Sequence, residues 1–426
     1  MIKTANIETL VGNHVAPYLY STQNFKPGET VIPYSGPYWD NQESEAAINA
    51  FLNGEWISAG ENVHQFEKAF SKRFNAGYSL MVNSGSSANL VMIAALKRYL
   101  NWKDGDEVIV SPAAFPTTVS VLYQNRLNPV FVDIEWDTLN FDVNQIEEKL
   151  TAKTKAIFLS PVLGNPPNMK YLIELCIFNE LELILDNCDS LGTKWAGQYL
   201  NEYAIASSCS FYAAHHLCTG EGGMVSTNNK ALMKIMQSIA HWGRDCNCIG
   251  SDNMSLKGSC GYRFDKWLEA YDGIVDHKYV FGNLGYNLKP LDLQGAIGLV
   301  QLNKFTEIEA KRKRSKTVIE KIVTKVPGVH GVQALLQADV CWFGTPFICE
   351  AEGLKHRIVE HLEKHLIQTR NYFSGNILMH PGYTFMDNYR KYPESNKVLD
   401  KVFFLGCAPH YTDEIFAYIE KVVKLF

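Results

Sequence analysis

One loop of this 426-residue chain carries the side chains best suited to acid–base chemistry. It spans residues 210–223, reads SFYAAHHLCTGEGG, and places paired histidines, His215 and His216, between Ser210 and a glycine-rich turn. An imidazole with an unperturbed pKa of about 6.5 accepts or donates a proton near neutral pH. Glycines in a turn let backbone N–H groups approach an anion closely. On residue types alone this is a candidate phosphate or cofactor loop, and either histidine could instead be an ordinary core or loop residue, which is the better interpretation for His216.

Two further polar stretches follow short apolar runs, where strands are expected to end. Asp186 ends the run LELIL, and residues 84–87 precede a helix rich in alanine and leucine. The unpaired N–H groups of a helix N-terminus bind anions, so Gly85 and Ser86 form a candidate phosphate site, with a plain helix cap as the alternative. Ser210 is either another phosphate ligand or a buried strand serine. Asp186 is either a cap or turn residue or the partner of a cofactor ring nitrogen.

Four of the ten cysteines form a spaced set that is compatible with a metal centre. They are separated by 57, 1 and 11 residues and are Cys188, Cys246, Cys248 and Cys260. A Cys-x-Cys pair followed by another cysteine in a glycine-rich segment can surround iron with thiolates. Zinc is the alternative, although Cys-x-Cys is shorter than the usual structural zinc spacing.

Composition limits the class of protein. Hydrophobic residues make up 46% of the chain, charged residues 20%, and the formal net charge is −5, so nothing favours binding to nucleic acid. No apolar run reaches the roughly 18 residues of a membrane span, and the first residues do not resemble a signal peptide. We expect a cytoplasmic protein in which disulfides are absent.

The order of expected elements indicates an α/β fold. Strand-like runs alternate with helical patterns, which predicts a mostly parallel sheet with crossover helices, and ligands bind such sheets at the carboxyl ends of the strands. Residues 1–305 are expected to form a large cofactor-binding domain with an N-terminal segment, and residues 306–426 a smaller C-terminal α/β domain. Helices are expected at Asn41–Asn53, Val63–Phe74, from Asn89 onward, and at Tyr411–Phe426.

Several motifs resemble those of the fold type I sugar aminotransferases, the DegT/DnrJ/EryC1/StrS family. The shared stretches are VNSGSSANL, GNPPNM, DNCDSLGTKW, SFYAAHH with GEGG, and NLGYNLKPLDLQGAIGLVQL. In that family a lysine five residues after the serine binds pyridoxal phosphate as a Schiff base, whereas this chain has His215 there. The resemblance therefore implies pyridoxamine 5'-phosphate, held without a covalent link, and an acid–base role for His215.

The same resemblance assigns further site residues. It implies that phosphate is bound at Gly85, Ser86 and Ser210, and that Asp186 pairs with the pyridine nitrogen. It also implies that Phe115 stacks on the pyridine ring, and that Asn287 crosses the interface of a homodimer to the neighbour's phosphate. From the residues alone, Phe115 is more simply a core residue, and Asn287 a turn residue.

The cysteine pattern, with HWGRDCNC and CGYRF, resembles that of the CDP-4-keto-6-deoxy-D-glucose 3-dehydrases. That resemblance implies a 2Fe–2S cluster on Cys188, Cys246, Cys248 and Cys260, although the last gap is longer here than in the family. It implies removal of the C3 hydroxyl of a nucleotide-linked 4-keto-6-deoxyhexose. Electrons would come from a flavin and iron–sulfur reductase, and the product would be a 3,6-dideoxy sugar precursor for lipopolysaccharide O antigen and other surface polysaccharides.

Three other functions stay open at this stage. An iron-independent 3-dehydratase, of the type that acts on GDP-4-keto-6-deoxymannose, would need no reductase. A nucleotide-sugar aminotransferase would need a lysine, and none stands at the loop position. A protein that binds the cofactor without catalysis would show no turnover of a nucleotide keto-sugar.

Overall fold

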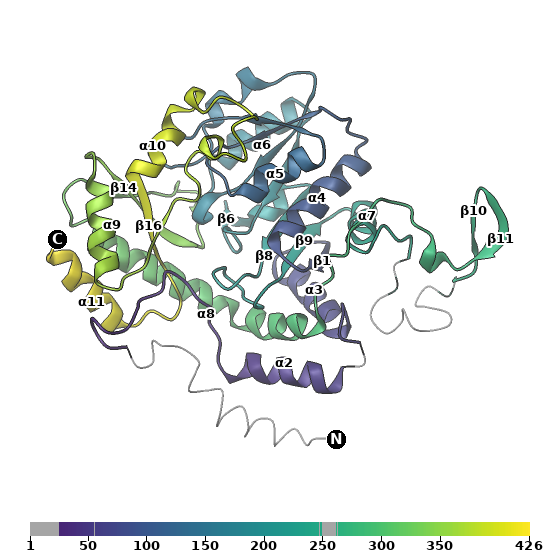
Figure 1. Ribbon diagram of the computed structural model, residues 1–426, viewed down its shortest axis with the longest axis horizontal. Helices are drawn as coiled ribbons and strands as arrows, with labels where there is room; N and C mark the ends of the chain where they lie inside the picture. Colours follow the sequence, from purple (N-terminus) through teal and green to yellow (C-terminus); the bar gives the residue numbers. More distant parts are fainter. Residues whose placement is uncertain (1–24, 55, 247, 249–260, 262) are drawn as a thin grey trace.

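The computed structural model describes residues 25–426 except 55, 247, 249–260 and 262 (Figure 1). Its centre is a seven-stranded sheet with the strand order β1-β9-β8-β5-β4-β2-β3. All strands run parallel except β9, which is antiparallel to both of its neighbours. The strands are β1 (Tyr78–Val82), β2 (Glu107–Val110), β3 (Asn128–Phe131), β4 (Thr154–Leu159), β5 (Glu182–Asp186), β8 (Ala206–Ser210) and β9 (Gly223–Thr227). The mostly parallel sheet predicted from the sequence is confirmed.

Helices cover both faces of this sheet. Side chains of β2 show the two layers, because Val108 and Val110 join one core cluster and Ile109 joins another. One layer contains α4 (Gly85–Tyr99), α5 (Pro116–Gln124) and α7 (Lys230–Ala240), and the other contains α3 (Glu61–Arg73) and α6 (Met169–Phe178). A sheet buried on both faces requires continuous apolar strands, which is the pattern the sequence has.

A smaller antiparallel sheet follows towards the C-terminus. Its strand order is β12-β14-β16-β15. The strands are β12 (Val329–Gly331), β14 (Gly344–Cys349), β15 (Thr369–Asn371) and β16 (Val402–Gly406), and the helices are α9 (Leu354–Lys364), α10 (Pro393–Lys401) and α11 (Asp413–Lys424). The 32-residue helix α8 (Asp292–Val323) runs from the large sheet to this second sheet. The predicted boundary between 305 and 306 lies inside α8, and the division into two domains stays a prediction.

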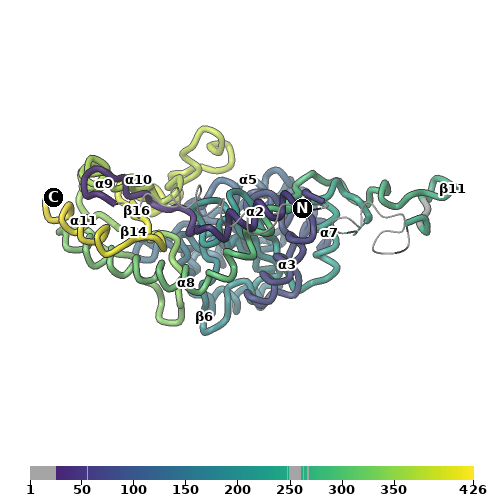
Figure 2. Tube along the Cα trace, turned by 90° about the horizontal axis from the view of Figure 1, so that it is seen from below, coloured from purple at the N-terminus to yellow at the C-terminus, as the bar shows by residue number. Residues whose placement is uncertain are grey.

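Two segments lie at the periphery. Helix α2 (Asn41–Asn53) packs along α8, and the hairpin of β10 (Lys266–Leu268) and β11 (Tyr271–Val275) projects away from the body of the molecule (Figure 2). A small sheet of β13 (Ala338–Asp339), β6 (Lys194–Trp195) and β7 (Gln198–Tyr199) lies over the strand ends. None of the helices in the described part of the chain is long and apolar enough to cross a membrane.

The expected helices agree with the structure to within a turn. The bounds of α2 are those predicted, and α3 and α11 differ by one or two residues at each end. Helix α4 starts four residues before the expected Asn89, because Ser84 is its cap and accepts a hydrogen bond from the Ser87 N–H at 3.1 Å. The earlier start brings Gly85 and Ser86 into the first turn, where N–H groups are unpaired.

Candidate active site

A cavity of about 530 Å³ opens at the carboxyl ends of the parallel strands. Five stretches at the ends of strands of the large sheet contribute to it, and the segment around β15 closes one side. The lining includes Gly85, Ser86, Phe115, Asp186, Cys188, Asp189, Ser210, Tyr212, His215, Phe343 and Arg370. The structure thus brings together six of the predicted site residues and Cys188.

Gly85 and Ser86, in the first turn of α4, line the cavity together with Ser210, and this part of the wall is called the anion recess. A Cβ on Gly85 would lie 2.5 Å from Cβ of Ser210 and 3.1 Å from Sγ of Cys188. Only glycine fits there, and Gly85 is buried beside Ser210 in the lining of the cavity. The helix dipole and free N–H groups at this end of α4 favour a negative group. These residues fit the phosphate of pyridoxal or pyridoxamine phosphate.

Asp186 ends β5 and is held by four hydrogen bonds. Its Oδ2 accepts from Asn89 Nδ2 at 2.8 Å and from Thr118 Oγ1 at 2.7 Å. Its Oδ1 accepts from the Cys188 N–H at 3.2 Å and from Ser208 Oγ at 3.4 Å. The carboxyl group is 4% exposed and its orientation is fixed. A fixed buried carboxylate in the wall of the cavity suits the nitrogen of a pyridine ring.

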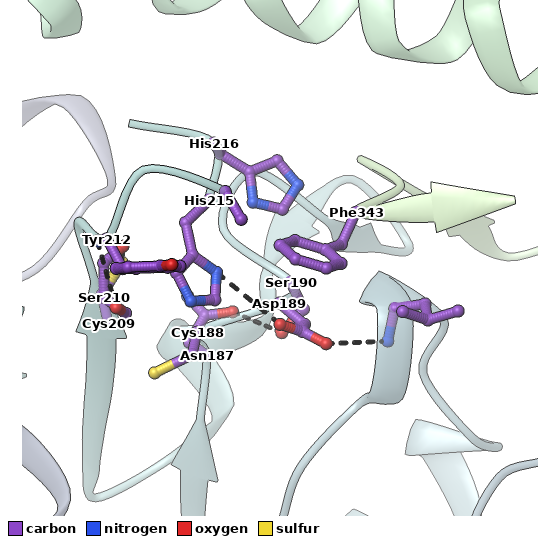
Figure 3. A network of polar contacts seen from close by, with 12 residues as sticks. Asn187, Cys188, Asp189, Ser190, Cys209, Ser210, Tyr212, His215, His216 and Phe343 are labelled. Atoms are coloured by element: carbon purple, nitrogen blue, oxygen red, sulfur yellow. Dashed lines mark hydrogen bonds and ion pairs between the residues drawn. The ribbon is translucent and has the colours of Figure 1, made fainter. Parts of the chain in front are cut away.

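His215 lies in the loop after β8 and faces the cavity (Figure 3). Its Nδ1 is 3.6 Å from Oδ1 of Asp189, which is too long for a hydrogen bond. The imidazole packs between two aromatic rings, with centroid distances of 5.1 Å to Phe343 and 6.4 Å to Tyr212. The backbone N–H of His215 donates to the Tyr212 carbonyl at 2.9 Å and closes the turn that carries the ring.

Burial controls the charge of the His215 imidazole. Burial first, and then the positive charge of Arg312, lowers the His215 pKa to about 4, against the opposing effects of Asp186 and the Cys188 carbonyl. Burial also raises the pKa of the Asp189 carboxyl to about 7. His215 is therefore uncharged near neutral pH, and its contact with Asp189 is not an ion pair. An uncharged imidazole can accept a proton.

His216 has a different environment from its neighbour. Its ring is 2% exposed, and its Nε2 lies 2.9 Å from the Cys341 carbonyl. Burial lowers its pKa well below the usual value. His216 does not line the cavity among the described residues, so its hydrogen bond serves to fix the loop.

The other two predicted cofactor residues lie in contrasting places. Phe115 caps α5, is 48% exposed, lines the cavity, and makes an edge-to-face contact with Phe373 at a centroid distance of 5.8 Å. Asn287 is absent from the described lining of this cavity; it pairs with the backbone of His241 and accepts a hydrogen bond from Lys289. A single chain therefore places Phe115 in the wall of the cavity but does not bring Asn287 to it. The contact of Asn287 with the phosphate stays a prediction.

Comparisons with known proteins identify the family. The model of the DegT/DnrJ/EryC1/StrS aminotransferase family matches residues 39–424. The chain belongs to this family. It is 36% identical over 412 residues to a dTDP-4-dehydro-2,6-dideoxy-D-glucose 3-dehydratase of Saccharopolyspora spinosa, covering 94% of this chain and 88% of the relative. It is also 36% identical to the lipopolysaccharide biosynthesis protein RfbH of Salmonella typhimurium, over 97% of this chain and 96% of the relative.

A solved structure supports the same assignment. The GDP-4-keto-6-deoxy-D-mannose-3-dehydratase of E. coli with bound hydrated PLP superposes with a TM-score of 0.81 at 27% identity, covering 93% of this chain and all of the other. The fold type I architecture expected from the sequence is therefore confirmed. The protein is a member of a family of PLP-dependent sugar aminotransferases and 3-dehydratases.

The candidate metal-binding cysteines that the structure describes lie in two separate places. Cys188 lines the large cavity, whereas Cys246 and Cys248 are buried in the wall of a second cavity of about 300 Å³ with His241 and Lys289. Cys260 lies outside the described residues. In the part of the chain that the structure describes, no group of three or more His, Cys, Asp or Glu side chains could hold a metal ion. The residues of one described chain therefore do not fit a 2Fe–2S cluster.

Several residues of the site escaped the sequence analysis. Asn89 and Thr118 orient Asp186, Phe343 packs on His215, and Arg312 acts on its charge. Asn89 gives a weak signal, because a polar residue interrupts an apolar helix face. Phe343 and Arg312 give none, since both reach the loop from distant parts of the chain.

Proposed function

We propose that this protein binds pyridoxamine 5'-phosphate in the large cavity and dehydrates a nucleotide-linked 4-keto-deoxyhexose at C3. One observation carries the proposal: an uncharged imidazole, that of His215, faces the cavity, and no lysine is among the described residues that line it. A fold type I transaminase needs a lysine amine to hold its coenzyme, whereas a dehydratase needs a base. The relatives named as sugar 3-dehydratases support the same choice.

The binding residues follow from the geometry of the cavity. Gly85, Ser86 and Ser210 would hold the phosphate, Asp186 would face the ring nitrogen, and Phe115 would cover one ring face. Pyridoxamine phosphate, when bound, supplies an amine for the keto carbon of the sugar and a ring that withdraws electrons. These five side chains and backbones keep the ring in one orientation.

His215 carries the proton in this proposal. Its neutral imidazole accepts a proton at a ring nitrogen from a carbon acid bound in the cavity, and returns it to the C3 hydroxyl as that group leaves as water. Asp189, whose pKa is raised by burial to about 7, lies 3.6 Å away and stabilises the imidazolium when it forms. Phe343 and Tyr212 shield the ring from water.

Arg370 suits the nucleotide part of the substrate. Among the described residues that line the cavity, Arg370 is the one that carries a guanidinium group. Its Cζ lies 4.1 Å from the centre of the Tyr34 ring. A guanidinium forms paired hydrogen bonds with phosphate oxygens. We assign it to the diphosphate of the sugar nucleotide.

The reductive form of this reaction stays a prediction from the sequence. It requires a 2Fe–2S cluster and a partner reductase, and the two cavities of a single chain separate Cys188 from Cys246 and Cys248. We therefore derive no electron-transfer step. Dehydration without iron is the second candidate, favoured by the fold shared with the GDP-4-keto-6-deoxy-D-mannose-3-dehydratase.

A homodimer is part of the proposal. Large apolar side chains are exposed along β11 and the segment after it, and Leu284 is 97% exposed. They are Tyr271, Ile274, Tyr279, Phe281, Leu284 and Tyr286. An exposed apolar surface beside Asn287 fits a subunit interface. Cross-linking and light scattering would test the dimer.

The deciding experiment is a product assay. Purified protein is loaded with pyridoxamine phosphate and incubated with CDP-, dTDP- and GDP-linked 4-keto-deoxyhexoses, and the products are analysed by mass spectrometry. We expect loss of the C3 oxygen from at least one substrate, and no product with His215→Asn. Transfer of an amino group with glutamate as donor, or no change in any substrate, would contradict the proposal.

Iron and acid-labile sulfide, measured on anaerobically purified protein, would distinguish the reductive from the iron-independent reaction.

A further inference from the structure

Arg312 is a buried charge with an unusual set of partners. It lies in α8, is 1% exposed, and is among the largest fully buried side chains of the described chain. Burying a charge is costly unless other groups compensate it. Among the described residues its guanidinium forms no ion pair with a carboxylate, and its hydrogen bonds go to backbone carbonyls and one thiol.

These carbonyls belong to the two walls that enclose the His215 imidazole. One terminal nitrogen of Arg312 donates to the carbonyls of Ala214 at 3.2 Å and His215 at 3.0 Å. The other donates to the Phe343 carbonyl at 3.2 Å. The Phe343 ring in turn packs on the His215 imidazole, with centroids 5.1 Å apart. One guanidinium thus connects the loop after β8 to the segment that leads into β14.

We propose that Arg312 is a positioning residue that holds the His215 imidazole against the Phe343 ring and over the cavity. The planar guanidinium has donors at both ends of a rigid fork, so it reaches both walls at once. A lysine ammonium at the same place has its three donors on one nitrogen, so it cannot span both walls as the two terminal nitrogens of the guanidinium do. The catalytic consequence rests on the proposed function, whereas the position of the imidazole can be measured without it.

The test compares Arg312→Lys and Arg312→Ala with a matched variant of the same helix. Lys304→Met is the control, because Lys304 is a largely buried cation of α8 that bonds to Glu43 at 2.7 Å and Asp40 at 2.9 Å, away from the loop. Each protein is examined for kcat, KM, affinity for pyridoxamine phosphate, and the NMR signal of the ¹³C-labelled His215 Cε1, assigned with His215→Asn. Arg312→Lys keeps the buried charge and provides the test if Arg312→Ala does not fold.

We expect kcat to fall about a hundredfold in Arg312→Ala, since a small misplacement of a reacting group costs that much. KM and coenzyme affinity should stay within about threefold, because the recess at Gly85 and Ser210 is untouched. The His215 signal should lose its ring-current shift from Phe343, Arg312→Lys should show a smaller loss, and millimolar methylguanidinium should restore part of the activity of Arg312→Ala. Lys304→Met should change none of these.

An unchanged His215 signal in both Arg312 variants would overturn the proposal, as would an equal loss of kcat in Lys304→Met. If wild-type protein turns over none of the nucleotide keto-sugars, the proposed function fails, and the NMR comparison still decides the role of Arg312.

Discussion

The two cavities of this molecule differ in what builds them. The large cavity lies at the ends of β5 and β8 and at the start of α4, so regular elements fix its walls. The second lies at the base of the projecting hairpin, between the irregular stretch after α7 and the start of α3. Each contains a partly buried histidine, His215 or His241, whose pKa is lowered by desolvation to about 4. The first also contains the hydrogen-bonded carboxyl group of Asp186 and the anion recess, and that combination makes it the candidate site for chemistry.

The largest expected effect distinguishes His215, which lines the first cavity, from the adjacent His216, which is not among the described residues that line it. His215→Asn should lower turnover about a thousandfold, because it removes the acid–base group. His216→Asn should lower the melting temperature and leave kcat within several-fold, since the His216 ring lies against the backbone of Cys341 and does not line the cavity in the described part of the chain. Steady-state kinetics and thermal unfolding check both. Equal losses of kcat would mean that the loop, rather than the His215 ring, is what the reaction needs.

A lysine at the same position tests the identity of the cavity. His215→Lys should bind pyridoxal phosphate covalently, in a form that borohydride traps, because it places an amine where the imidazole stood. Mass spectrometry of the reduced protein would locate the coenzyme. Attachment to any other lysine would show that the large cavity is not where the coenzyme binds.

A pH experiment compares the histidines of the two cavities. The folded-state pKa of His241 is depressed, so its contribution to stability is present above about pH 6.5 and is lost as the pH falls through 4. The loss between pH 8 and pH 4 is roughly 3 kcal/mol. Urea unfolding across this range should show a shallower decline in His241→Asn than in wild type. Turnover of His241→Asn at pH 7 should equal that of wild type. A loss of turnover as large as that of His215→Asn would show that both cavities contribute to one active site.

The anion recess gives a smaller effect. Gly85→Ala should weaken coenzyme binding by about ten- to a hundredfold, because the added methyl would overlap Ser210, an overpacking of about 1–3 kcal/mol. Gly382→Ala is the control, since a Cβ there meets no atom within 4 Å. Titration with pyridoxamine phosphate, followed by fluorescence, measures both. Similar affinities would contradict the assignment of the phosphate to α4.

The smallest effect is expected from the cysteines. Cys246→Ser and Cys248→Ser should leave coenzyme affinity unchanged within about twofold, because both line the second cavity. Cys188→Ser should change coenzyme affinity most of the three, because the Cys188 sulfur lies beside the recess. If Cys188→Ser and Cys246→Ser both release iron from anaerobically purified protein, the two cavities contribute to one metal centre across subunits.

The sequence predicted those parts of the site that follow from local order. Asp186 and Ser210 could be placed because each ends an apolar run, and Gly85 because it follows one and starts a helix. The partners of these residues could not, since Asn89 and Thr118 reach Asp186 only through the packing of α4 and α5 on the sheet. His215 was identified by position, but its lowered pKa depends on burial by Phe343 and on Arg312. The spacing of the cysteines, taken alone, did not reveal that a turn at Asp186 places Cys188 in a different cavity from Cys246 and Cys248.

The hydrogen bonds of Arg312 also bear on how the chain folds. Its partners at Ala214, Phe343 and Cys407 lie 98, 31 and 95 residues away in the sequence, so they are contacts of high contact order. During synthesis, the loop of His215 leaves the ribosome long before Cys407 does. The full set of bonds that holds this loop can therefore form only when the chain is nearly complete.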